Sequence, residues 1–249
     1  IRGIFIPEED CEWGIFDYSQ QEPRIVVHYA SMKNFTGADK FVDAYRDDEK
    51  TDFHKMVSEI ADIPRKKAKT INLALFYGMG KGKLMSQLGI NLEDATEMLA
   101  NYNERVPFVK QLMNDTMNKA GKKGYLSTLE GRRCRFELYE PTNEWGQKAL
   151  PFKEAKDEYG EHMIKRAWTY KALNRLIQGS AADQTKKAML ELSKEGYLAH
   201  IQVHDELDFS VATEKDKSKI KEIMEHAVKL EVPSKVDVEC GDSWGDAGD

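Results

Sequence analysis

The sequence predicts an α+β protein in which strands from both chain ends share one sheet around an inserted, mainly helical middle. One observation is an apolar strand pattern, WGIFDY, at residues 13–18. Another is a strand–turn–strand, helix, strand order over residues 198–240. Strands joined by a tight turn pair antiparallel, and a mixed order of strands and helices is typical of α+β proteins. A single antiparallel sheet built from both ends is therefore the simplest arrangement.

The individual elements follow from apolar periodicity and from the positions of proline and glycine. Pro23 is tolerated in the first turn of a helix, whereas Pro64 starts the next basic helix and Gly78 ends it. In the first half we expect a strand at 13–18 and helices at 20–32, 53–61, 65–77, 92–104 and 107–120. In the second half we expect a hairpin at 125–138, a loop at 140–160, a long helix at 162–194, strands at 198–203 and 206–211, a helix at 214–229 and a strand at 236–240.

The composition is that of a globular protein. The 249 residues are 41% hydrophobic and carry 37 Lys and Arg against 43 Asp and Glu, a net charge of −6. No apolar run approaches the 18 or so residues that a membrane span requires. The three cysteines, Cys11, Cys134 and Cys240, form no CxxC pair, which argues against a disulfide framework or structural zinc. We therefore expect a cytoplasmic protein.

Positive charge is concentrated in two segments. Residues 64–84 contain six Lys and Arg and no acid, and residues 119–135 contain six against one acid, Glu130. The rest of the chain is correspondingly acidic. This segregation favours a polyanion-binding face beside an acidic centre, although a solvated helix face remains an open alternative.

Acidic residues lie where the predicted strands end. Asp17 ends the first strand, and Asp205 and Glu206 lie at the tight turn of the C-terminal hairpin. Carboxylates held rigidly at adjacent strand ends suit a hard cation such as Mg²⁺, which keeps open positions for water and phosphate. Aspartate is also a common turn residue, so Asp205 alone has a simpler interpretation.

The basic helix carries its cations on one face. Arg65, Lys69 and Leu73 recur at helical spacing and lead to Phe76 and Tyr77. Such a face could hold a triphosphate through Arg and Lys while a base stacks further along. The alternative is an amphipathic surface helix in which Leu73 and Tyr77 belong to the core.

Three segments resemble, in order, the signature motifs of family A DNA polymerases, the DNA polymerase I type. They are DYSQQEPR at 17–24, RKKAKTINLALFYG at 65–78 and QVHDE at 202–206. TLEGRRCR, LNRLIQGSAAD and the C-terminal VECGDSWGDA are also similar to family segments. The resemblance covers nearly the whole chain and has a phage-like character because Leu73 replaces the usual aromatic residue.

The resemblance implies a role for each matching residue. Asp17 and Asp205 would bind two Mg²⁺ ions with the carbonyl of Tyr18, and Glu206 would be a supporting acid. The nucleotide-binding residues would be Arg65, Lys69 and His54 at the phosphates, Glu22 as the gate against a ribose 2′-OH, Leu73 near the sugar, and Tyr77 at the templating position. Lys69 would also be catalytic. The DNA contacts would come from Asn174, Gln178, His204, Arg132 and Arg133, and Arg24 would be a structural ion-pair partner.

The resemblance also implies a domain organisation. Residues 1–31 and 172–249 would form the palm and residues 32–171 the fingers, with thumb and exonuclease domains absent. We therefore expect the catalytic core of a template-directed DNA polymerase, a fragment or split subunit of a longer one. Its partners would be primer–template DNA, dNTPs and the missing portion as a separate chain. Two alternatives stay open: a non-catalytic nucleic-acid-binding module with this fold, and a metal-dependent phosphohydrolase. Tyr170 replaces an arginine of many relatives, which removes one expected DNA contact.

Overall fold

The computed structural model describes residues 1–79, 81–143 and 146–248. The chain divides into two compact units. Unit 1 comprises residues 1–32 and 39–52 and the chain from Ser180 onward, and unit 2 comprises residues 33–38 and 53–179. No helix in the described part of the chain combines the length and apolar character needed to cross a membrane.

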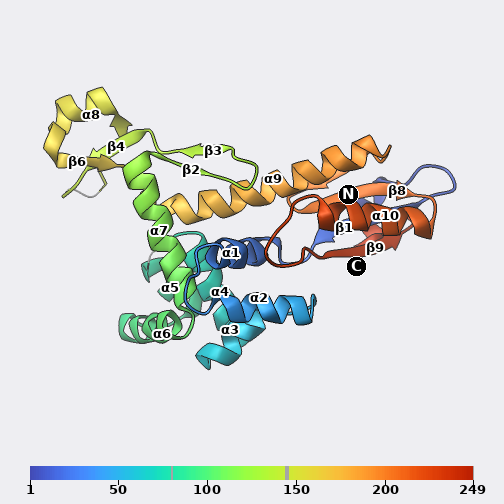
Figure 1. Cartoon of the computed structure of the whole chain (residues 1–249), viewed down its shortest axis with the longest axis horizontal. Coiled ribbons are helices and arrows are strands. Elements are labelled where there is room, and N and C mark those ends of the chain that lie inside the picture. Colours follow the sequence, from blue (N-terminus) through green and yellow to red (C-terminus); the bar gives the residue numbers. More distant parts are fainter. Residues whose placement is uncertain (80, 144–145, 249) are drawn as a thin grey trace. The chain divides into compact units, whose positions relative to one another are not determined.

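Unit 1 is built on a four-stranded antiparallel sheet (Figure 1). Its strand order is β7-β8-β1-β9, so β1 from the start of the chain lies between two strands from its end. The prediction of one antiparallel sheet from both chain ends is thus confirmed. The strands are β1 (Glu12–Tyr18), β7 (Ile201–Val203), β8 (Glu206–Val211) and β9 (Val236–Gly241).

Both faces of this sheet are covered, which explains why β1 reads as a nearly continuous apolar run. On one face Phe16 and Phe209 meet edge to face and pack with Met224 of α10 (Glu214–His226). On the other face Trp13 and Ile15 pack against α11 (Trp244–Ala247). The sheet therefore forms the core of unit 1 and leaves its strand ends free to carry polar side chains.

The loops behind β1 are joined by the buried side chain of Arg24, in α1 (Gln21–Ser31). Its guanidinium donates to three backbone carbonyls, those of Ser19 (2.8 Å), Glu49 (2.5 Å) and Pro233 (2.6 Å). It also stacks on the ring of Tyr45, in α2 (Ala38–Asp47), at 4.4 Å. The expected ion pair is thus replaced by carbonyls, which satisfy the rigid guanidinium fork equally well.

Unit 2 begins with a group of helices around an aromatic core. Phe53 contacts both Phe76 and Phe108, and Tyr102 is fully buried. The helices are α3 (Phe53–Ala61), α4 (Arg65–Phe76), α5 (Lys81–Leu88), α6 (Leu92–Arg105) and α7 (Pro107–Lys123). Helices α3, α4, α6 and α7 lie close to the predicted bounds, whereas α2 and α5 had not been predicted.

The remainder of unit 2 differs most from the sequence prediction. The expected loop at 140–160, apart from residues 144–145 outside the described ranges, contains a strand and a helix that starts after Pro151. The long helix begins at Ala172 instead of residue 162, because residues 161–166 form a 3₁₀ turn and a strand and Trp168 then adopts a left-handed conformation (φ 58°, ψ 23°). The elements are β2 (Tyr125–Ser127), β3 (Arg133–Arg135), β4 (Leu138–Pro141), β5 (Leu150–Pro151), α8 (Phe152–Tyr159), β6 (Ile164–Arg166) and the start of α9 (Ala172–Lys194), with short 3₁₀ turns η2 (Glu161–Met163) and η3 (Thr169–Lys171). From Ser180 onward α9 belongs to unit 1, as does the 3₁₀ turn η1 (Arg2–Ile4).

Candidate active site

The sheet of unit 1 gathers acidic residues at one edge. The register pairs Asp17 of β1 with Glu206 of β8 on one side and with Asp237 of β9 on the other. Asp205 lies in the β7–β8 turn, where its carbonyl accepts a hydrogen bond of 3.2 Å from the backbone N–H of Tyr18. The ends of three strands therefore place Asp17, Asp205 and Glu206 beside one another.

Burial and mutual repulsion perturb these carboxyl groups. Burial raises the pKa of Asp17 to about 7, and the negative charges of Asp205, Glu206, Asp237 and Glu239 add to the effect. Burial also raises the pKa of Asp205, partly offset by its own backbone N–H. Because like charges disfavour ionisation of both groups, a bound cation would relieve the repulsion. The edge is therefore electrostatically prepared for positive charge.

The donor set fits a magnesium ion. Within the described ranges, no three His, Cys, Asp or Glu side chains converge to enclose a metal ion by themselves. Mg²⁺ is usually held by one or two carboxylates and completes its octahedron with water and substrate phosphates. Asp17, Asp205 and the Tyr18 carbonyl supply oxygen atoms only, which is the chemistry such an ion requires.

Two residues that the sequence analysis missed contact the acidic edge. The indole N–H of Trp244 donates a hydrogen bond of 3.2 Å to a carboxylate oxygen of Glu206. Asp208 has no exposed surface, and neither of its carboxylate oxygens has a hydrogen-bond partner in the described part of the chain. Burial, followed by the charge of Glu206, raises the pKa of Asp208 to about 7. The sequence offers no signal for the burial of Asp208, because it alternates with Leu207 and Phe209 and falls on the opposite face of the strand.

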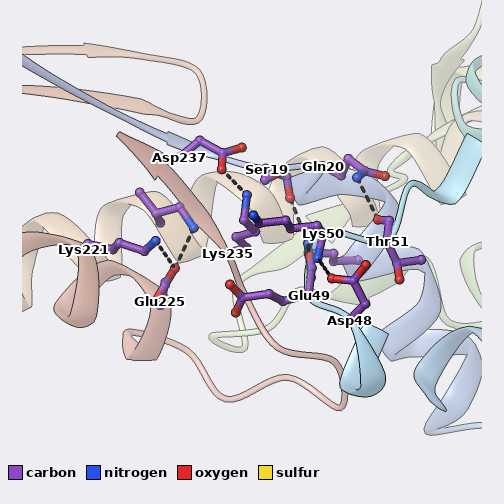
Figure 2. Close-up of polar contacts among 12 residues, drawn as sticks. Ser19, Gln20, Asp48, Glu49, Lys50, Thr51, Lys221, Glu225, Lys235 and Asp237 are labelled. Carbon is purple, nitrogen blue, oxygen red and sulfur yellow. Dashed lines mark hydrogen bonds and ion pairs between the residues drawn. The ribbon is translucent and has the colours of Figure 1, made fainter. Parts of the chain in front are cut away.

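Beside the acidic edge, Lys235 supplies a compensating positive charge just before β9, the last strand of the sheet. Figure 2 shows the ammonium group of Lys235 pointing toward Asp237, with which it is paired. Burial acts to raise the pKa of Asp237, but the hydrogen bonds from Lys235 and Ser19 and the charges of Lys235 and Lys221 together outweigh it, and the net pKa lies below its usual value. Nearby, Glu225 accepts from the backbone N–H of Val236 at 2.9 Å. Asp237 is thus occupied by Lys235, which leaves Asp17 and Asp205 for a metal ion.

The basic helix α4 in unit 2 has the predicted exposed face. Arg65 and Lys69 are exposed, Leu73 is half-buried, and Tyr77 follows the helix and is 38% exposed. Phe76, which the sequence placed on this face or beside it, belongs to the core. The cations are therefore accessible to a ligand.

His54 of unit 2 is held by a buried polar network. It is 8% exposed, and its Nδ1 lies 2.9 Å from the amide nitrogen of Asn72. The hydroxyl of Tyr102 donates to the oxygen of the same amide at 2.5 Å. Asn72 and Tyr102 were not predicted, and an asparagine at an apolar helix position was the available signal. The network fixes the ring of His54 next to α4.

The predicted DNA contacts fall in both units. In unit 2, Gln178 is exposed and Asn174 half-buried on α9, and Arg132 donates to the carbonyl of Gly179 at 2.8 Å. Arg133 is exposed and lies over the ring of Tyr125 at 4.8 Å. In unit 1, His204 is exposed at the β7–β8 turn, and Glu22, which was predicted to bind the nucleotide, is half-buried in α1. Their roles stay predictions.

Comparison with known proteins identifies the fold and the family of this chain. A solved structure with a TM-score of 0.78 and 30% identity is the POL domain of Pol1 from M. smegmatis, in complex with DNA primer-template and dNTP; the match covers all of this chain and 43% of that one. The fold is therefore that of a polymerase domain. The family model of DNA polymerase family A matches residues 1–246, and the chain belongs to this family.

Curated relatives agree with the assignment. The DNA-directed DNA polymerase of Pseudomonas phage M6 is 38% identical over 285 residues, which cover 98% of this chain and 40% of the relative. DNA polymerase I of Bacillus subtilis (strain 168) is 34% identical over 99% of this chain and 27% of the relative. The chain thus spans well under half the length of these relatives.

Proposed function

We propose that the chain is the catalytic core of a template-directed DNA polymerase, which adds dNTPs to a primer 3′-OH. The observation that carries the proposal is the sheet register that sets Asp17 beside Glu206 and next to Asp205. Family membership supports the same reaction class. Unit 1 would be the palm and most of unit 2 the fingers, as part of a longer or split polymerase.

In this proposal the acids hold two Mg²⁺ ions. When bound, the ions would lower the pKa of the primer hydroxyl and neutralise the triphosphate and the leaving pyrophosphate. Asp17, Asp205 and the Tyr18 carbonyl would supply the ligands, and Glu206 would support them from the neighbouring strand. Asp17 and Glu206 are held by strand pairing and Asp205 by the tight turn between two paired strands, so little reorganisation would accompany catalysis.

The side chains of unit 2 would bind and orient the nucleotide. Arg65 and Lys69 would offset negative charge on the phosphates, with His54 nearby. Tyr77 would pack at the templating position, and Glu22 of unit 1 would exclude a ribose 2′-OH. Sequence choice would come from the template base, so the protein needs backbone contacts more than base-edge readout. Asn174, Gln178, His204, Arg132 and Arg133 would provide those contacts.

Primer extension tests the proposal. The longest natural polypeptide that contains the chain is incubated with a labelled primer–template, Mg²⁺ and dNTPs, beside Asp205→Ala and the control Glu222→Ala, which removes an exposed acid on α10. We expect Asp205→Ala to lower incorporation at least about a hundredfold and Glu222→Ala to leave it unchanged. Nucleic-acid binding without any Mg²⁺-dependent incorporation would contradict the proposal and favour a non-catalytic binding module.

A further inference from the structure

A lysine lies close to two exposed aromatic rings just before α9. The ammonium nitrogen of Lys171 is 5.7 Å from the ring centre of Trp168 and 5.6 Å from that of Tyr170. Trp168 is 37% exposed and Tyr170 is 46% exposed. Among the described residues, no carboxylate lies within ion-pair distance of Lys171. Its charge is therefore available to an anion while both rings remain accessible.

The backbone of Trp168 is held in an unfavourable conformation. Its φ of 58° lies in the left-handed region, which bulky side chains rarely adopt. Burial does not compensate for this strain, because more than a third of the side chain remains exposed. Strain of this kind accumulates at functional sites, where the surrounding structure maintains it.

Tyr170 lies against the end of the basic helix α4. Gly78 has a φ of +63°, and a Cβ added there would lie 2.6 Å from the carbonyl oxygen of Tyr170 and 3.5 Å from its ring. Gly78 directly follows the exposed Tyr77, within the stretch 64–84 that contains six cations and no acid. Exposed rings and positive charge thus meet in one part of unit 2.

We propose that Trp168, Tyr170 and Lys171 form a stacking platform for unpaired nucleotides of the template strand. Bases stack on the two rings, and Lys171 neutralises a phosphate between them, as single-strand binding requires. Double-stranded DNA does not fit this description, because its bases already stack on each other. The inference rests on the proposed function for the identity of the strand and extends it beyond the templating position at Tyr77.

The test compares primer–templates with the same duplex and either one or eight unpaired template nucleotides, by fluorescence anisotropy at fixed salt. The wild-type chain, in the longest natural polypeptide that contains it, binds the longer overhang more tightly. In Trp168→Ala/Tyr170→Ala this preference falls about tenfold or more, whereas the affinity for the one-nucleotide overhang is retained. Lys171→Ala weakens the preference and lowers the salt dependence by about one phosphate contact.

Three controls separate stacking from folding and from catalysis. Trp168→Phe and Tyr170→Phe keep a ring and keep the preference, and Leu92→Ala removes an exposed apolar side chain elsewhere in unit 2 without effect. An overhang preference unchanged in the double variant overturns the platform. A third outcome separates the two proposals. If the protein never extends a primer but binds single-stranded oligothymidine, and the double variant loses that binding, the platform is supported and the proposed function fails.

Discussion

The acidic sheet edge of unit 1 and the basic helix of unit 2 carry opposite charges and are built in opposite ways. Asp17 and Glu206 come from opposite ends of the chain and meet only because β1 pairs with β8. Arg65 and Lys69 lie one turn apart on α4 and are exposed to solvent. The acids owe their position to long-range strand pairing, and the cations owe theirs to local helical geometry.

This difference predicts two kinds of response to substitution. Charges brought together by sheet pairing are partly desolvated and repel each other, so they affect stability as a function of pH. Charges on an exposed helix face are solvated, so their removal affects ligand binding with little change in the free energy of unfolding. Each experiment below tests one side of this comparison.

The largest effect is expected at Asp208, the buried acid of the sheet. Its pKa of about 7 in the folded chain exceeds the ordinary value of 3.8, so the folded state binds this proton more tightly than the unfolded state. Its contribution to stability is therefore lost as the pH rises from about 4 to about 7. The variant Asp208→Asn lacks this titrating group. We therefore expect its advantage over the wild type in unfolding free energy to grow by about 2–3 kcal/mol as the pH rises from 5 to 8.

Urea unfolding at pH 5, 6, 7 and 8 measures this gain. Glu97→Gln, at an exposed position on α6 of unit 2, serves as the control and should follow the wild-type pH profile. Parallel pH profiles of Asp208→Asn and wild type would contradict the raised pKa of Asp208 in the folded chain.

A smaller effect, on ligand binding alone, is expected at Lys69. Lys69→Ala removes an exposed cation from the face of α4 proposed to bind phosphate, and a charge-assisted hydrogen bond contributes about 1.5–3 kcal/mol. We therefore expect kcat/KM for dNTP incorporation to fall tenfold to a hundredfold while the Tm changes by less than about 2 °C. Lys66→Ala, which removes another exposed cation from the same helix, is the matched control. Equal losses in both variants would mean that net charge, and not position, governs binding.

The same comparison explains what the sequence could predict of the fold. Helices α3, α4, α6 and α7 have clear periodicity with proline or glycine at their ends, and their predicted bounds are close to those observed. The sequence predicts the long helix from residue 162, ten residues before α9 begins, because neither the short strand β6 nor the left-handed Trp168 has a clear sequence signal. Helix α8 was missed because the prolines and glycines around it indicated a loop, although Pro151 stands just before its first turn.

The candidate site was predictable where motifs or local spacing define it. Strand-end acids and cations one turn apart are visible in the sequence, and the register that joins the acids agrees with the predicted sheet. The partners of these residues were not visible. Trp244 reaches Glu206, Lys235 reaches Asp237, and Asn72 reaches His54 only through tertiary packing.

Trp244 offers the smallest and most specific test of the acidic edge. Its ring contacts Phe5 at 5.5 Å and Arg2 at 4.5 Å, so Trp244→Phe keeps an aromatic ring there and removes the hydrogen bond to Glu206. That hydrogen bond is half-buried, and its loss should cost about 1 kcal/mol, or roughly fivefold in kcat, with KM for dNTP unchanged. If Trp244 acts only by positioning Glu206, the substitution has no further effect in a Glu206→Ala background, which lacks the accepting oxygen, because a double-mutant cycle isolates the interaction between the two residues. Additive losses would instead assign the effect of Trp244 to the packing of α11 on the sheet. Single-turnover incorporation with the four variants measures both terms of this cycle.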